Sequence, residues 1–386
     1  MDAEVVIVGG ALVGAALARA LAGSPLALIS QERRVPGPLP AVFDSRIYAI
    51  SPANAAFLAE LGVWQQIPAA RLTPVHGMRV WGDDGRSKIE FDAYQSGVSE
   101  LAWIVEDALL QDALWRLLET QERLEVVAPA EFEWFEASAA GAKVTLRGGR
   151  CIEAKLVVGA DGARSLLRMR AGIEAREHAY AQSAVVANFA CERPHRNVAL
   201  QWFQGGPVLA LLPLPGERVS MVWSTTDADA ARLLGLEGDA LAREVAQASA
   251  YALGELSLLS PARSFPLRSL IAARSIGQRA ALVGDAAHVV HPLAGQGANL
   301  GFQDARVLAQ TLRSREPFRD PGDVRLLRRY ERVRAEAILA MRATVHGLFL
   351  LFGAQERLFG PLRNAGLNLV NRLPVLKNVL MRRAMN

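Results

Sequence analysis

The sequence is poor in cysteine and in lysine. Its 386 residues include two cysteines, Cys151 and Cys191, with neither a CxxC pair nor metal-ligand spacing. The absence of such spacing argues against disulfides and structural zinc, and a reducing compartment is expected. Four lysines stand against 39 arginines. We interpret this bias as genome composition and expect no nucleic-acid partner, because no interleaving of basic and aromatic residues accompanies it.

Long hydrophobic runs are absent as well. No run of about 18 apolar residues occurs, so no membrane-spanning helix is predicted. Residues 1–30 contain no basic n-region, which argues against a signal peptide. The six histidines include no HExxH, and we expect no metal site. With 51% hydrophobic and 21% charged residues, the chain is expected to be globular and cytoplasmic.

The hydrophobic pattern predicts an α/β fold. An apolar strand at 4–8, a glycine-rich turn, a small-residue helix and a second strand at 25–30 form a βαβ unit. Later strands alternate, as in an antiparallel sheet. We therefore expect a Rossmann-like domain with an inserted, mostly antiparallel substrate domain and a C-terminal helical segment. The predicted ranges are 1–72, 97–178 and 270–330 for the first, 73–96 and 179–269 for the second, and 331–386 for the third.

The turn after the first strand is typical of dinucleotide sites. Gly9 and Gly10 allow a tight turn, Gly14 allows the helix to pack on the strand, and a pyrophosphate would sit at the helix N-terminus. Ala11 replaces the middle glycine of the usual GxGxxG. Ser30 stands where an acidic residue normally binds the ribose. A plain βαβ turn is the alternative.

Two further motifs end strands with an aspartate. Asp161-Gly162 follows "LVVGA" and precedes Arg164-Ser165; here an ordinary Asp-Gly turn is the alternative. Residues 281–305, "ALVGDAAHVVHPLAGQGANLGFQDA", predict a strand, a glycine-rich loop and a helix, with an apparently buried Asp285. We interpret His288 and His291 in this stretch as structural rather than catalytic.

Together, in this order, the three motifs resemble the group A FAD-dependent aromatic monooxygenases of the p-hydroxybenzoate hydroxylase fold, over nearly the whole chain. The resemblance implies FAD as cofactor and NAD(P)H as electron donor. It implies that the glycine turn and Asp161-Gly162 bind FAD, that Asp285 binds the ribitol, and that the following loop lies along the isoalloxazine ring. The implied site residues are Gly9, Gly10, Gly14, Arg46, Asp161, Gly162, Gly284, Asp285, Pro292, Gly295, Gln296, Gly297, Ala298 and Asn299. Helix capping alone is the alternative for Gln296 and Asn299.

A closer resemblance is to the ring hydroxylases of ubiquinone biosynthesis. It is carried by "DSRIYAIS", "WIVEDALLQDALW", "HPLAGQGANLGFQDA" and the closing "RRAMN", and by Glu106-Asp107 where other group A enzymes often have arginine. It implies O2-dependent hydroxylation of a polyprenyl-phenol ring through a flavin C4a-hydroperoxide, with no catalytic acid or base identified. A flavin-dependent isoprenoid reductase and a non-catalytic flavin-binding scaffold of the biosynthetic complex remain alternatives.

The C-terminal residues are strongly basic. Residues 341–386 contain seven basic residues and Glu356 as their one acidic residue, which gives this segment a charge of +6 in a chain of net charge +4. A substrate with a long isoprenoid tail stays in the bilayer. We therefore expect residues 363–386 to dock at the inner face of the membrane, or the protein to act with other ubiquinone-biosynthesis proteins. Leucines that cap the core, with arginines as a solvated rim, are the alternative.

Overall fold

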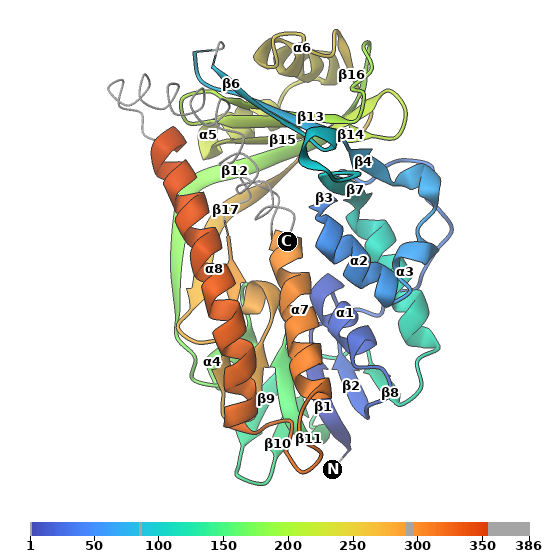
Figure 1. The fold of residues 1–386 in the computed structure, drawn as a ribbon, viewed down its shortest axis with the longest axis vertical. Helices are drawn as coiled ribbons and strands as arrows, with labels where there is room; N and C mark the ends of the chain where they lie inside the picture. The colour runs from blue at the N-terminus through green and yellow to red at the C-terminus, as the bar shows by residue number, and fades with distance from the viewer. Residues whose placement is uncertain (1, 85–86, 291–296, 354–386) are drawn as a thin grey trace.

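The computed structural model describes residues 2–84, 87–290 and 297–353, whose strands form three sheets (Figure 1). The first sheet contains five parallel strands in the order β8-β2-β1-β11-β19. Its strands are β1 (Ala3–Val8), β2 (Leu26–Ile29), β8 (Leu124–Val127), β9 (Phe132–Ala137), β10 (Ala142–Leu146), β11 (Cys151–Gly159), β18 (Ile276–Gly277) and β19 (Ala280–Leu282). The order reverses between β1 and β11, which is where ligands bind in open α/β sheets.

Both faces of this sheet are covered. Val5 and Ile7 of β1 face the helices, whereas Val6 and Val8 face the β9–β10 hairpin. The buried strand therefore has no polar face, which explains its continuous apolar run. The helices of this domain are α1 (Leu12–Ala20), α2 (Pro52–Glu60), α3 (Asp107–Glu119), α4 (Leu166–Arg170), α7 (Gly297–Arg313) and α8 (Val324–Gly353).

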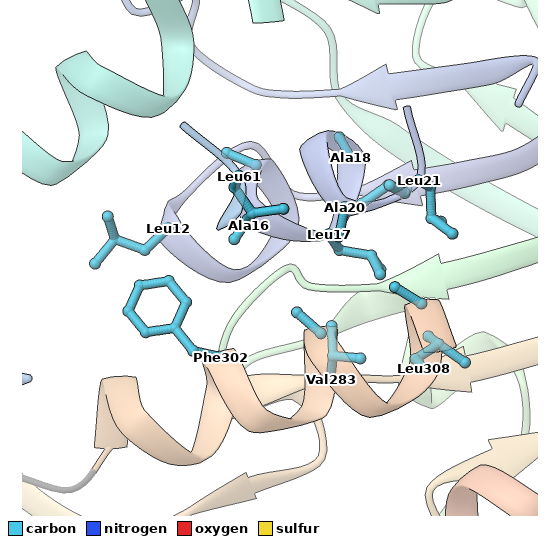
Figure 2. Close-up of a cluster of buried hydrophobic side chains, with 14 of the residues drawn as sticks. Leu12, Ala16, Leu17, Ala18, Ala20, Leu21, Leu61, Val283, Phe302 and Leu308 are labelled. Atoms are coloured by element: carbon cyan, nitrogen blue, oxygen red, sulfur yellow. The ribbon is translucent and has the colours of Figure 1, made fainter. Parts of the chain in front are cut away.

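Helices α1 and α7 pack closely although almost 300 residues separate them in the chain. Ala16 and Leu17 of α1 meet Phe302 and Leu308 of α7, with Val283 between them (Figure 2). The alanines of α1 permit this close packing because they carry only a methyl group. The first and last parts of the predicted Rossmann-like domain thus share one core.

The second sheet is mostly antiparallel and lies at one end of the molecule (Figure 1). Its order is β20-β17-β12-β15-β14-β13-β5-β6, and helices α5 (Asp227–Leu234) and α6 (Gly238–Ala248) cover one face. The strands are β5 (Gly77–Trp81), β6 (Lys88–Asp92), β12 (Ala175–Cys191), β13 (Val198–Phe203), β14 (Val208–Leu214), β15 (Arg218–Thr226), β16 (Leu256–Leu258), β17 (Arg263–Ala272) and β20 (His288–Val289). The predicted α/β fold with an antiparallel insertion is confirmed.

A three-stranded sheet, β3-β7-β4, connects the two larger ones. It consists of β3 (Ile47–Ile50), β4 (Thr73–Val75) and β7 (Ala102–Glu106). The exact domain boundaries stay a prediction. The long helix α8 begins at Val324, before the predicted start of the C-terminal segment at residue 331, and residues 354–386 lie outside the described residues.

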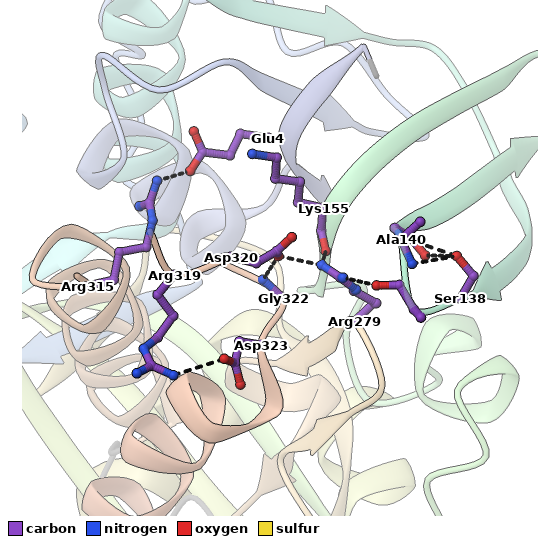
Figure 3. Close-up of polar contacts among 12 residues, drawn as sticks. Glu4, Ser138, Ala140, Lys155, Arg279, Arg315, Arg319, Asp320, Gly322 and Asp323 are labelled. Carbon is purple, nitrogen blue, oxygen red and sulfur yellow. Dashed lines mark hydrogen bonds and ion pairs between the residues drawn. The ribbon is translucent and has the colours of Figure 1, made fainter. Parts of the chain in front are cut away.

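Polar contacts fix the connection between α7 and α8 to the base of the first sheet (Figure 3). Arg315 pairs with Glu4 of β1, and Arg279 pairs with Asp320. Gly322 lies so close to β11 that a Cβ there would be 2.2 Å from the Lys155 carbonyl oxygen. These contacts set where α8 starts and hence which of its residues reach the site.

Candidate active site

The three sequence motifs converge where the carboxyl ends of β1, β11 and β19 meet. A Cβ on Gly9, which has a φ of +112°, would lie 2.2 Å from the Ala160 carbonyl oxygen. A Cβ on Gly301 of α7 would lie 2.4 Å from the Val13 side chain. The β1–α1 turn therefore touches both other motifs, and side chains at these glycines would separate them.

The glycine turn has the features of a phosphate cradle. A Cβ on Gly14 would lie 1.9 Å from the Gly9 carbonyl oxygen, so only glycine lets α1 start this close to β1. Helix α1 has no capping side chain and no acidic residue in its first turn. Its first N–H groups are thus available to an anion, as the pyrophosphate of a dinucleotide requires. Ala11 is exposed at the N-cap.

The floor of this turn is formed by Ser30 and Trp115. A Cβ on Gly10 would lie 2.6 Å from the Ser30 Oγ, and Trp115 donates from Nε1 to the Gly10 carbonyl oxygen at 3.0 Å. The Ser30 hydroxyl donates to the Glu32 carbonyl oxygen at 2.7 Å. The sequence pattern indicates Ser30 at this position but not Trp115. A tryptophan on the buried face of an amphipathic helix is normally interpreted as a core residue.

Asp161 forms hydrogen bonds within the second motif. Its carboxylate accepts from the Ser165 hydroxyl at 2.5 Å and from the Leu167 backbone N–H at 3.1 Å, so it caps the start of α4. Burial raises the pKa of the Asp161 carboxyl, and these hydrogen bonds oppose that rise. Gly162 has a φ of +79°, as the Asp-Gly turn requires. A role of either residue toward FAD stays a prediction.

Asp285 is exposed, not buried as its apolar surroundings in the sequence indicated. It follows β19 in a short 3-10 turn, where Gly284 has a φ of +60° and packs against Val13. The residue is exposed, yet neighbouring protein partly desolvates its carboxyl. This partial desolvation raises its pKa, and His288 and Arg46 oppose the rise. An accessible carboxylate beside the glycine turn can accept hydrogen bonds from a polyol.

A buried network, which the sequence pattern does not predict, holds the Gly284–Asp285 turn. Asp304 of α7 has no solvent exposure, and its Oδ2 accepts from the Gly284 N–H at 2.8 Å. The same oxygen lies 2.7 Å from the His288 Nε2, and Arg334 of α8 donates to the Oδ1 at 2.5 Å. Burial opposes the charge on Asp304, but His288 and Arg334 lower its pKa. The buried contact of His288 with Asp304 agrees with a structural role, which stays a prediction.

A second polar cluster lies beside Asp285. Arg46 is exposed, and its guanidinium lies over the ring of Tyr48, 5.8 Å from the ring centroid. Tyr48 and Gln111 both hydrogen-bond Asp107, Gln111 at 2.7 Å. Burial raises the pKa values of Tyr48 and Asp107, so the phenol stays protonated. Arg46 is near enough to Asp285 for each charge to favour the other.

Glu106 and its neighbour Asp107 hold the backbone around Arg46 in place. Its carboxylate forms a buried bidentate pair with Arg71, at 2.7 and 2.6 Å, and accepts from the Asp44 N–H at 2.7 Å. The Asp107 N–H donates to the Arg46 carbonyl oxygen at 2.9 Å. The sequence showed Glu106 and Asp107 but could not show that they fix the chain on either side of Arg46.

The helix α7 begins at Gly297, at the edge of this site. Asn299 is buried, with its Nδ2 donating to the Ala49 carbonyl oxygen at 2.7 Å and its Oδ1 accepting from the Ser51 N–H at 2.9 Å. Its side chain thus connects α7 to β3 and α2. A ligand at this edge would therefore meet mainly the backbone groups of Ala298 and Asn299. A flavin contact of either residue or of Gly297 stays a prediction, and Pro292, Gly295 and Gln296 lie outside the described residues, as does His291.

The chain matches the family described as FAD binding domain over residues 2–344. The chain belongs to the group A FAD-dependent monooxygenases. It is 35% identical to the ubiquinone hydroxylase UbiL of Rhodospirillum rubrum over 385 residues, which covers 99% of this chain and 89% of that protein. It is 34% identical to the 3-demethoxyubiquinol 3-hydroxylase of Escherichia coli over 388 residues, which covers 99% and 98%. Its fold is similar to that of p-nitrophenol 4-monooxygenase PnpA of Pseudomonas putida, with a TM-score of 0.79 at 17% identity, covering 100% and 98%.

FAD is therefore the cofactor, and the residues present fit it. The uncapped N-terminus of α1 suits its pyrophosphate, and the accessible Asp285 suits a hydroxylated chain. Within residues 2–84, 87–290 and 297–353, no group of three or more His, Cys, Asp or Glu is arranged to hold a metal ion. Over the same part of the chain, every helix is too short or too polar to cross a membrane.

Proposed function

We propose that this protein is an FAD-dependent monooxygenase that hydroxylates the aromatic ring of a polyprenyl-phenol intermediate in ubiquinone biosynthesis, with O2 as co-substrate and NAD(P)H as electron donor. The observation that carries the proposal is the convergence of the three FAD motifs in a chain that is similar over 99% of its length to two ubiquinone hydroxylases.

Within this proposal, the second sheet forms the wall of the substrate site. The face of the sheet opposite α5 and α6 is tied to the Arg46 loop, because Asn188 of β12 donates from Nδ2 to the carbonyl oxygens of Phe43 and Asp44 at 3.1 and 3.0 Å. On the same face, Val222 and Ala210 are paired in register and only half-buried. Apolar side chains there would receive an aromatic ring and exclude water.

The chemistry divides between cofactor and protein. FAD supplies oxygen activation when bound, since no side chain can do so. The residues around Asp285 and Arg46 would bind and orient the cofactor, and the sheet would keep water from the reacting atoms. No acid–base pair is required of the protein, because the phenol oxygen already activates the ring.

Profiling of quinone intermediates in a deletion strain tests the proposed function. We expect a prenylated phenol that lacks one ring hydroxyl to accumulate, and its structure identifies the carbon that is hydroxylated. Accumulation of a species with an unreduced isoprenoid double bond would instead favour the reductase alternative. Complementation by a protein purified without flavin would favour the non-catalytic scaffold.

We further propose that residues 363–386, which lie outside the described residues, dock at an anionic membrane surface on the cytoplasmic side. The segment has five basic and no acidic residues, each basic group contributing up to about 1 kcal/mol near such a surface. Co-sedimentation with anionic liposomes should weaken at high salt. It should also weaken when Arg372, Lys377, Arg382 and Arg383 are changed to Gln. Equal binding by both forms would favour delivery by another biosynthetic protein.

A further inference from the structure

The segment Val35–Val42, here named the apolar loop, exposes hydrophobic side chains in a row. Val35, Leu39 and Val42 are 75%, 50% and 63% exposed, and Pro38, Pro40 and Ala41 are exposed as well. No charged residue lies between Arg34 and Asp44. Single exposed apolar residues are common on protein surfaces, but a continuous apolar stretch marks an interaction site.

The apolar loop is held in place at both ends. Arg34 donates from Nε to Asp112 of α3 at 2.5 Å and from Nη2 to the Ala108 carbonyl oxygen at 3.1 Å. At the other end, Phe43 packs on the core beneath the second sheet, with the Arg71 guanidinium 4.0 Å from its ring centroid. The exposed side chains therefore project from a fixed support on α3.

Part of the backbone of the apolar loop is satisfied within the protein. Pro36, Pro38 and Pro40 have no N–H to satisfy. Arg116 donates to the Gly37 carbonyl oxygen at 2.6 Å, and Arg71 donates to the Pro40 carbonyl oxygen at 2.6 Å. Unsatisfied backbone groups make irregular loops costly in lipid. The three prolines and the two arginine contacts lower that cost at the headgroup boundary, where the other backbone groups still meet water.

We infer that the apolar loop inserts into the hydrocarbon–headgroup boundary of a lipid bilayer and brings the flavin site to the membrane. The choice of lipid as the partner rests on the proposed function, because a polyprenyl-phenol resides in the bilayer. The apolar loop is separated from Arg46 by three residues, Phe43, Asp44 and Ser45, so the inserted surface adjoins the candidate site. Insertion of uncharged side chains does not depend on anionic lipid, unlike the docking proposed for residues 363–386.

Vesicle flotation with the FAD-loaded, full-length protein tests this inference. On vesicles of phosphatidylcholine alone, at high salt, we expect binding that falls about tenfold or more when Val35, Leu39 and Val42 are all changed to Ser. These side chains are exposed, so folding should be unaffected. The matched control is Phe318→Ser. It removes an aromatic side chain that is 84% exposed and distant in sequence from the apolar loop, so it should leave vesicle binding unchanged.

A fluorescent label measures whether the apolar loop enters the bilayer. In a Cys151→Ser background, which removes the exposed thiol and leaves the buried Cys191, Leu39→Cys carries an environment-sensitive dye. We expect its emission to shift to the blue on vesicles, and the same dye on Phe318→Cys to remain unshifted. No binding of wild type to phosphatidylcholine, equal binding by the triple variant, or equal dye shifts at both positions would overturn the inference.

Two measurements separate this inference from its rivals. If the apolar loop contacts a second copy of the chain, sedimentation velocity will show a dimer that the triple variant breaks, without vesicle binding, and lipid insertion is then wrong. Vesicle binding needs no turnover. Wild type that binds vesicles but hydroxylates no prenylated phenol overturns the proposed function alone. A triple variant that hydroxylates a short-chain phenol in solution normally, but a long-chain phenol in vesicles slowly, supports both.

Discussion

At the scale of single residues, Asp285 is the side chain whose loss should most directly weaken FAD binding. Asp285→Ala removes an accessible acceptor and leaves cofactor hydroxyls without a partner, at a cost of about 1–3 kcal/mol of binding free energy. Titration of the apoprotein with FAD measures the change. Asp239→Ala, at an exposed position in the first turn of α6, is the control. Unchanged flavin affinity in Asp285→Ala would contradict the assignment.

Asp304 is also a single-residue case, but its loss should act mainly on the stability of the fold. Asp304→Asn keeps the shape, removes the charge that Arg334 and His288 face, and should cost about 3–5 kcal/mol of unfolding free energy near neutral pH. The folded-state pKa of Asp304 is lowered, so its stabilisation is present above the unfolded-state pKa and is lost as pH falls through the folded-state value. The difference between the variant and wild type should therefore shrink in acid.

Denaturant unfolding from neutral to acidic pH checks this prediction. Asp323→Asn is its control, because that carboxyl also has a lowered pKa but lies near the surface, and its loss should cost well under 1 kcal/mol. FAD affinity should fall in Asp304→Asn as well, since one amide oxygen cannot accept from both the Gly284 N–H and Arg334. A stability difference that stays constant down to strongly acidic pH would argue against a charged Asp304.

At the scale of elements, the β1–α1 turn makes two opposite predictions. Ala11→Gly should tighten FAD binding or leave it unchanged, because it removes a methyl group from the N-cap, where we expect the pyrophosphate to bind. Gly14→Ala should weaken FAD binding at least tenfold, because the new Cβ would lie 1.9 Å from the Gly9 carbonyl oxygen. The control is Gly235→Ala, where an added Cβ meets nothing closer than 3.5 Å. Loss of FAD on Ala11→Gly would mean that the turn does not follow dinucleotide geometry.

At the scale of the whole molecule, FAD should stabilise segments that lie far apart in the sequence. The turns after β1, β11 and β19 meet at one site, so FAD bound there would connect all three. An excess of 100 times the dissociation constant should add about 2.7 kcal/mol to the unfolding free energy and raise the melting temperature by several degrees. Differential scanning calorimetry measures the shift. In Asp285→Ala, the same FAD concentration should produce a smaller shift.

The sequence by itself determined the fold class and the family, and it located the three glycine-containing turns that meet in the structure. Glycines such as Gly9 and Gly14 are readable because a backbone contact leaves no room for a Cβ, and that constraint acts within a few residues of the chain. Strands such as β1 are readable because burial on both faces demands an unbroken apolar run. Local physical requirements of this kind leave their mark in local sequence.

Only the tertiary structure decided which charges meet. Asp304 lies on the buried face of α7, with Leu300 and Leu308, which signals a buried partner but cannot identify Arg334 on the next helix. The sequence predicts a buried Asp285, but the structure exposes it, because solvent access depends on how three distant turns come together. Trp115 and Asn299 likewise have side-chain roles set by packing. Contacts between residues far apart in the chain are selected by the summed burial of the whole core, so no short stretch of sequence contains them.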